Sequence, residues 1–234
     1  MANVIKIKKG LDINLKGKAS DVLLNGGKSD SYAIVPDYYN GIVPKVVAKV
    51  GEKVKAGSVL MIDKNRPEIK FVSPVSGEVT AVNRGEKRKV LSVVVKPEAQ
   101  IEYEDFGKKN VASLKREEVK EAILHAGMWP FIKQRPYDIV AAPLDTPRDI
   151  FVSAFYSAPL APNFDFIVKG QEADFQTGLN ALAKLTNGKV YVGVRSGSVV
   201  SGMKGVEIVE VEGPHPAANV GVQINHIKPV NKGE

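Results

Sequence analysis

The apolar positions of the first half of the chain alternate in short runs, and the same pattern occurs twice between residues 34 and 95. Gly41–Val43 and the turn Gly51–Lys53 return as Gly77–Val79 and the turn Gly85–Lys87. A repeat this short cannot bury an apolar face alone, so the two copies are expected to pack together as one small β-module. The alternation predicts two facing sets of side chains: Val46, Val50, Val54 and Leu60 against Val79, Val82, Leu91 and Val93.

From residue 111 the spacing of the apolar positions changes. Residues 116–127 predict a helix that ends at Gly127, and the helical spacing of Phe175, Leu179, Leu182 and Leu185 predicts a second helix over residues 174–185. Short β-branched or aromatic runs predict strands, at residues 139–142, 151–154, 164–168, 189–194, 206–211 and 220–227. Strands that alternate with helices indicate a parallel sheet.

The expected fold class is therefore α/β (α+β overall), with a β-module followed by a Rossmann-like α/β domain. We expect an N-terminal segment at residues 1–33, the β-module at 34–110 and the α/β domain at 111–234. The strand expected at residues 220–227 would lead toward a further domain that is missing from this chain.

Composition narrows the classes of protein that these elements can build. With 234 residues and 44% hydrophobic residues, the chain can bury a core and form one or two domains. It has no cysteine, which excludes disulfides, thiolate metal sites and iron–sulfur clusters held by this chain alone. No apolar run approaches the roughly 18 to 20 residues that span a bilayer, and no signal peptide is visible at the N-terminus. We expect a soluble, cytoplasm-facing polypeptide.

The net charge of +7 is concentrated in the first half of the chain. Residues 1–110 hold 20 Lys and Arg against 13 Asp and Glu, whereas residues 111–234 hold 13 of each. This distribution suggests a docking face for an acidic partner or an anionic membrane surface, and its densest group is Lys87, Arg88 and Lys89. A solvated turn is the simpler alternative. Nucleic acid is disfavoured because no recognition motif is present and only 7% of residues are aromatic.

Motifs of catalysis and nucleotide binding are sparse. The chain has neither a Gly-x-Gly-x-x-Gly fingerprint nor a P-loop, nucleophile elbow or paired-histidine metal motif. Residues 195–198, after a predicted strand, could be a flexible loop or a phosphate cradle. His215 lies between two prolines that fix its backbone, either as a catalytic residue or as a hydrogen-bonded loop histidine. We predict no catalytic, cofactor-binding or metal-binding residue in this chain.

Residues 50–60, followed by Ser73-Pro74-Val75-Ser76-Gly77-Glu78-Val79, resemble the biotinyl/lipoyl-like barrel-sandwich hybrid family. In lipoyl domains the modified lysine lies at a hairpin apex, which here falls near Pro67. Lys64 lies only four residues past Leu60 and ten before Pro74. We therefore expect Lys64 to be a surface lysine, and a lipoyl-like carrier is an alternative function for this segment.

A second resemblance covers nearly the whole chain. Ile5-Lys6-Lys8-Gly10-Leu11 and five ordered motifs, at residues 126–136, 147–154, 158–161, 175–179 and 212–217, are similar to the NqrA family, which belongs to the sodium-translocating NADH:quinone oxidoreductases. The family motif Ala-Met-Asp-Thr is replaced here by Ala154-Phe155-Tyr156-Ser157, so a phenol stands in place of the acid. Family members also continue beyond the equivalent of Glu234, which suggests that this chain is an N-terminal fragment.

The resemblance implies a peripheral subunit on the cytoplasmic face of the bacterial inner membrane. The complex would pass electrons from NADH to ubiquinone and export sodium, with flavins and iron centres in partner subunits and none in this chain. The integral quinone-side subunit is the expected partner, and quinone is a candidate ligand. Candidate contacts with quinone or a partner are Trp129, Arg135, Gly213, Pro214, His215 and Pro216. An RnfC-like electron-transport subunit is the nearest alternative, but its cysteine motifs are absent here.

Overall fold

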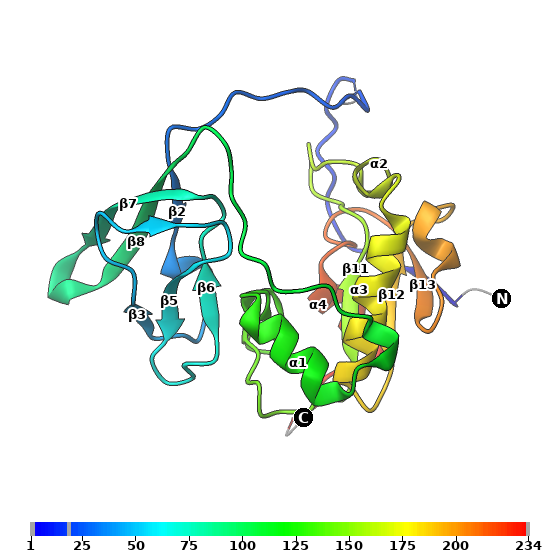
Figure 1. Ribbon diagram of the computed structural model, residues 1–234. Coiled ribbons are helices and arrows are strands. Elements are labelled where there is room, and N and C mark those ends of the chain that lie inside the picture. The colour runs from blue at the N-terminus through cyan, green and yellow to red at the C-terminus, as the bar shows by residue number, and fades with distance from the viewer. Residues whose placement is uncertain (1–2, 18–19, 233–234) are drawn as a thin grey trace. The chain divides into compact units, whose positions relative to one another are not determined.

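The computed structural model describes residues 3–17 and 20–232, which form two compact units (Figure 1). Within these ranges, unit 1 comprises the residues up to 24, residues 111–116 and the residues from 146 onward. Unit 2 comprises residues 25–110 and 117–145. The expected boundaries differ in two places, because the N-terminal strand belongs to unit 1 and residues 117–145 pack with the β-module in unit 2.

A four-stranded parallel sheet lies at the centre of unit 1. Its order is β1 (Asn3–Lys6), β13 (Glu207–Glu212), β12 (Val190–Val194) and β11 (Ile150–Ser153). All neighbouring strands run parallel, with Val192 opposite both Val152 and Ile208. The first residues of the chain thus complete a sheet whose other strands lie more than 140 residues later.

Helices cover both faces of this sheet (Figure 1). On one face, α3 (Glu172–Leu185) packs Leu179 against the alternate valines of β12. On the other face, α4 (Val220–Ile227) packs Val222 against a cluster that includes Tyr191 and Val211. Gly193 allows α4 to approach closely, since a Cβ at this position would lie 2.2 Å from Oε1 of the buried Gln223. The parallel sheet with helices on both faces confirms the predicted α/β class.

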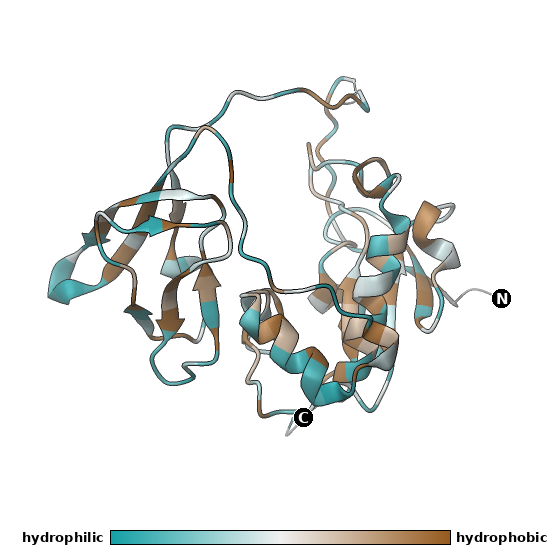
Figure 2. Cartoon of the chain, viewed as in Figure 1, coloured by the Kyte–Doolittle hydropathy of each residue, from teal (hydrophilic) through white to brown (hydrophobic). Residues whose placement is uncertain are grey.

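Two of the predicted strands are helices. Residues 164–168 form α2 (Phe164–Val168), which is almost entirely hydrophobic (brown in Figure 2), and residues 220–227 form α4. Each follows an asparagine N-cap: the Asn163 side chain accepts from the Asp165 N–H at 3.1 Å, and the Asn219 side chain accepts from the Gly221 N–H at 2.9 Å. Short apolar runs fit either period, so these caps decide the helical conformation. His226 accordingly lies on a helix.

The strand predicted at residues 139–142 is also wrong in its partner. Only β10 (Ile139–Val140) forms there, and it pairs antiparallel with β9 (Lys133–Gln134) in unit 2. The remaining described elements are short 3-10 helices, namely η1 (Pro36–Tyr38), η2 (Glu86–Arg88), η3 (Val111–Ser113), η4 (Trp129–Phe131) and η5 (Val199–Gly202). None of the helices in the described ranges is long and apolar enough to cross a bilayer.

Two antiparallel sheets enclose the core of unit 2. One has the order β2 (Tyr32–Ile34), β8 (Val90–Pro97), β7 (Gly77–Arg84) and β4 (Lys53–Val54); the other has the order β3 (Pro44–Val46), β5 (Val59–Asp63) and β6 (Lys70–Val72). The predicted core residues Val54, Leu60, Val79 and Val93 are buried, with Val46 and Val82 packed against them.

Two residues of the predicted core instead face solvent. Leu91 is 43% exposed because it follows the buried Val90, and alternation along β8 points its side chain outward. Val50 is 62% exposed because it lies in the turn before Gly51 and not in a strand. The repeat therefore predicted the module correctly but shifted these two positions.

The helix α1 (Arg116–His125) ends against the β-module. Gly127 has a φ of +68°, its N–H donates to Leu124 O, and the N–H of Met128 donates to Ile123 O. These bonds form a Schellman cap, as the predicted C-terminal glycine requires. A Cβ at Gly127 would lie 2.4 Å from Cγ1 of Val72 in β6, so only glycine permits this contact.

Candidate functional site

The loop Gly213-Pro214-His215-Pro216 leaves the parallel sheet at the carboxyl end of β13. Ligands of open parallel sheets bind at this edge. Gly213 has a φ of +125°, and a Cβ there would lie 2.2 Å from Ile7 O, so glycine is required where the loop crosses the segment after β1. That segment holds the His215 backbone, whose N–H donates to Asp12 Oδ1 at 2.8 Å and whose carbonyl accepts from the Leu11 N–H at 2.9 Å.

Ser157, on the loop after β11, holds the imidazole ring of His215. Its Oγ lies 3.1 Å from His215 Nδ1 and accepts the Ala218 N–H at 3.0 Å. Both side chains are half-buried. The serine therefore joins the loop after β11 to the loop after β13.

Arg195 follows β12 and supports the same loop from below. Its Nη1 donates to Val211 O at 3.3 Å and its Nη2 to Gly213 O at 3.1 Å. The guanidinium also lies 4.6 Å from the ring centroid of Phe155, a cation–π distance. Segments after all four strands thus converge on one polar cluster, defined as the His215 site by Asp12, Ser157, Arg195 and His215.

Sequence reasoning found His215 through its flanking prolines but missed the other three members of the site. Ser157 and Arg195 each lie shortly after a correctly predicted strand, and strand order alone could have brought them together. Asp12 had no such signal, because β1 was not predicted. The neighbouring Tyr156, which replaces the family's acid, is 52% exposed.

The phosphate cradle considered for residues 195–198 is already occupied by a carboxylate. Asp165 Oδ1 accepts the Ser198 hydroxyl at 2.5 Å and the Val199 N–H at 3.3 Å. A phosphate would be repelled by this aspartate. Because Arg195 and Ser198 are both tied down, the loop is an ordered support for the His215 site.

Trp129 and Arg135 belong to unit 2, apart from the unit that carries His215. Trp129 is 5% exposed, and its indole N–H donates to Ala141 O at 2.8 Å. Arg135 pairs with Asp138 at 3.4 Å across the β9–β10 turn. The burial of Trp129 and its satisfied N–H favour a packing role for this residue.

The basic turn Lys87-Arg88-Lys89 joins β7 to β8 and is fully solvent-facing. Lys87 and Arg88 have φ values of +52° and +62°, and Lys89 pairs with Asp37 at 2.7 Å. Within the described ranges, no ion pair joins the Lys87 or Arg88 side chain. The lysines of the neighbouring turns are paired, Lys53 with Glu98 at 3.1 Å and Lys55 with Glu102 at 3.5 Å.

The β5–β6 hairpin, where a lipoyl domain carries its lysine, is fastened to the rest of unit 2. The Arg66 Nε donates to the buried Asp63 at 2.7 Å, and its two other nitrogens donate to Val140 O and Gly41 O. The backbone N–H of Lys64 donates to Val43 O at 2.7 Å. An anchored hairpin fits a swinging-arm carrier poorly.

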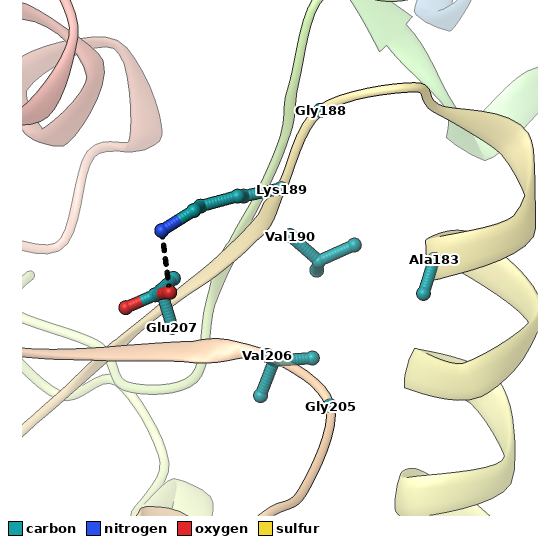
Figure 3. A pocket seen from close by; sticks show the side chains of 7 residues that line it. All are labelled: Ala183, Gly188, Lys189, Val190, Gly205, Val206 and Glu207. Carbon is teal, nitrogen blue, oxygen red and sulfur yellow. Dashed lines mark hydrogen bonds and ion pairs between the residues drawn. The ribbon is translucent and has the colours of Figure 1, made fainter.

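A shallow cavity of about 290 Å³ lies at the opposite, amino end of the parallel sheet in unit 1 (Figure 3). Its charged pair is Lys189 and Glu207, joined at 2.7 Å, and hydrogen bonding to Glu207 raises the pKa of Lys189. The two charges satisfy each other, so the cavity presents no free catalytic group. In the described part of the chain, no cluster of His, Cys, Asp or Glu could hold a metal ion.

Comparison with known proteins identifies the family of both units. Residues 5–98 match the NqrA N-terminal barrel-sandwich hybrid domain, and residues 114–234 match the NqrA second alpha/beta domain. These matches confirm both resemblances seen in the sequence.

Three relatives are each named as the NqrA-type component, the A subunit, of a Na(+)-translocating NADH-quinone reductase. The protein of Photorhabdus laumondii subsp. laumondii is 37% identical over 232 residues, that of Hahella chejuensis 38% over 233, and that of Vibrio atlanticus 38% over 231. Each match covers 97% of this chain and 52% of the relative, so the chain spans about half the length of these relatives. The chain therefore belongs to the NqrA family and carries its barrel-sandwich hybrid and second α/β domains.

Proposed function

We propose that the protein represented by this chain is a peripheral subunit of a sodium-pumping NADH:quinone oxidoreductase, on the cytoplasmic face of the bacterial inner membrane. The observation that carries the proposal is 37% identity along 97% of the chain to a protein whose name makes it a component of that enzyme. In the proposed complex, electrons pass from NADH to ubiquinone and sodium is exported. Flavins and iron centres reside in partner subunits, and this chain holds none.

The proposed contact with quinone or a neighbouring subunit is the loop Gly213–Pro216. Its support is its place at the carboxyl edge of a parallel sheet and the convergence of four loop segments there. Arg135 remains a candidate in unit 2, where it is partly exposed. Trp129 is left out because its side chain is buried and its N–H is bonded.

The proposed docking element is the basic turn Lys87-Arg88-Lys89, which would meet an acidic surface of the integral quinone-side subunit. Two of its three charges lack an ion-pair partner within the described part of unit 2, whereas Lys89 is balanced by Asp37. Exposed charges more than roughly 8 Å apart are screened at physiological salt. Such a turn would therefore act mainly by steering the encounter between subunits.

Charge reversal in the assembled complex tests this function. The triple variant Lys87→Glu, Arg88→Glu, Lys89→Glu would be expressed in the full-length protein with all partner subunits, and its recovery in the purified complex measured with quinone reduction at low and moderate salt. We expect slower assembly and a loss of its salt dependence. The matched control reverses three other exposed lysines of unit 2, Lys64, Lys108 and Lys109. Assembly equal to that of the wild type at both salt concentrations would reduce the basic turn to a solvated surface, and failure of the wild-type protein to copurify with the complex would refute the subunit role.

A further inference from the structure

We infer that Ser157 is a positioning residue that fixes the His215 imidazole with its proton on Nε2, so that this N–H is offered to a hydrogen-bond acceptor at the carboxyl edge of the parallel sheet. The ligand class is an apolar molecule with a carbonyl oxygen. Naming it as a quinone rests on the proposed function, whereas the position of the proton rests only on the geometry of unit 1.

The hydrogen bonds of Ser157 decide where the histidine proton lies. The Ser157 Oγ already accepts the Ala218 N–H at 3.0 Å, and its own hydroxyl proton needs an acceptor. The unprotonated Nδ1 of His215, 3.1 Å away, is that acceptor. A neutral imidazole has one donor and one acceptor nitrogen, so Nδ1 accepts and Nε2 carries the proton. The opposite tautomer would direct a third proton toward Oγ and leave the serine proton without a bonded acceptor among the described residues.

The backbone around His215 is fixed independently of Ser157. Asp12 accepts the His215 N–H, and Arg195 donates to Gly213 O at 3.1 Å. With the backbone held, the bond to Ser157 is the contact that sets the orientation of the ring. Among the described residues, none hydrogen-bonds Nε2, so this donor remains available to a ligand.

The surroundings of the site select the class of ligand. The charged groups are already engaged: the Arg195 guanidinium with two carbonyls and the Phe155 ring, and Asp12 with the His215 N–H. Large apolar side chains on the adjoining segments are exposed, namely Leu11 at 77%, Tyr156 at 52% and Leu160 at 83%. A neutral donor beside apolar surface suits a carbonyl compound better than a phosphate, which prefers charged donors.

Nitrogen NMR on the chain labelled with ¹⁵N-histidine tests the inference, because the shifts of Nδ1 and Nε2 report which nitrogen carries the proton. The spectrum contains its own reference: His226 Nδ1 lies 2.9 Å from Val222 O, so that ring must carry its proton on Nδ1 when neutral. Above the range in which histidine titrates, we expect His215 in the Nε2–H form and His226 in the Nδ1–H form. Ser157→Ala should move the His215 shifts toward those of a free imidazole, and Ser157→Thr should restore them. A His215 proton on Nδ1, or shifts unchanged in folded Ser157→Ala, would overturn the inference; if Ser157→Ala fails to fold, the wild-type and Ser157→Thr tautomers decide.

Titration with ubiquinone-1 then separates the positioning role from the identity of the ligand. We expect the His215 Nε2 signal to shift while the His226 signals stay in place, and binding to weaken about five- to tenfold in Ser157→Ala, as for one lost hydrogen bond. An Nε2–H tautomer with no response to quinone supports the positioning role of Ser157 and counts against quinone as the ligand in the proposed function.

Discussion

At the scale of single residues, Asp149 shows how one buried carboxylate fastens two elements of unit 1. Its Oδ2 lies 3.3 Å from Arg148 Nε and 2.5 Å from Lys228 Nζ, just beyond α4, and its Oδ1 accepts the Lys189 N–H at 3.0 Å. Burial by itself would raise the pKa of Asp149. The hydrogen bonds from Lys228 and Lys189 and the charges of Lys228 and Arg148 outweigh it and hold the pKa below its usual value.

Replacing this carboxylate should therefore destabilise unit 1 in a pH-dependent way. Asp149→Asn leaves Lys228 and Arg148 without their buried counter-charge, and we expect a loss of about 3 kcal/mol in the free energy of unfolding at pH 7. Since the folded-state pKa is lowered, the stabilisation is present above roughly pH 4 and is lost as pH falls through the folded pKa. The difference between wild type and variant should thus shrink in acid. Urea unfolding across this range measures it, with Asp174→Asn at an exposed position of α3 as the control; equal losses in both variants would contradict the role of the ion pairs.

At the scale of elements, the β5–β6 hairpin depends on a single arginine. Arg66 bonds the buried Asp63 and two backbone carbonyls on other segments, Gly41 and Val140. Asp63 in turn accepts the Val43 and Asn65 N–H groups. The hairpin is therefore cross-linked to its neighbours by polar contacts, in addition to the apolar core beneath it.

Removing Arg66 should loosen this hairpin more than its surface position suggests. Arg66→Ala leaves the Asp63 carboxylate, 1% exposed, without a counter-charge, and we expect a loss of about 3 kcal/mol or more in the free energy of unfolding. Hydrogen exchange should accelerate at the Val43 and Lys64 N–H groups. Lys64→Ala is the matched control in the same hairpin and should change stability by less than about 0.5 kcal/mol. A comparable loss in both variants would show that hairpin truncation, and not the buried pair, is responsible.

The elements also show where sequence reasoning succeeds. The helix α3 and the strands β12 and β13 were predictable because their apolar residues keep one period over the whole element. The helices α2 and α4 were not, because runs of 5 and 8 residues satisfy both periods and only the preceding asparagine distinguishes them. His215 was predictable from local backbone constraints. Its partners Asp12 and Ser157 were not, because their convergence depends on which strands end side by side in the sheet.

At the scale of the whole molecule, the order of the chain and the division into units do not coincide. Unit 1 is assembled from three separate stretches of sequence, and unit 2 is inserted between them in two parts. The strand β1 explains this arrangement, since it pairs with β13 more than 200 residues later. A boundary drawn from local composition therefore assigns the N-terminal residues to neither domain. Each unit nevertheless has its own apolar core.

The chemical state of the purified chain gives a prediction for the molecule as a whole. Neither unit offers redox chemistry of its own: the described residues contain no metal-ligand cluster, and Asp165 fills the one loop that could have held a phosphate. Lys64 begins an anchored hairpin and does not stand at its apex. We expect the chain, made in cells with active lipoylation, to have the mass calculated from its sequence and no flavin absorbance after gel filtration. Intact mass spectrometry and an absorption spectrum check both points on one sample, with a lipoyl domain from the same cells as the positive control. A lipoyl mass located on Lys64 would support the carrier alternative, and a retained flavin band would place redox chemistry in this chain itself.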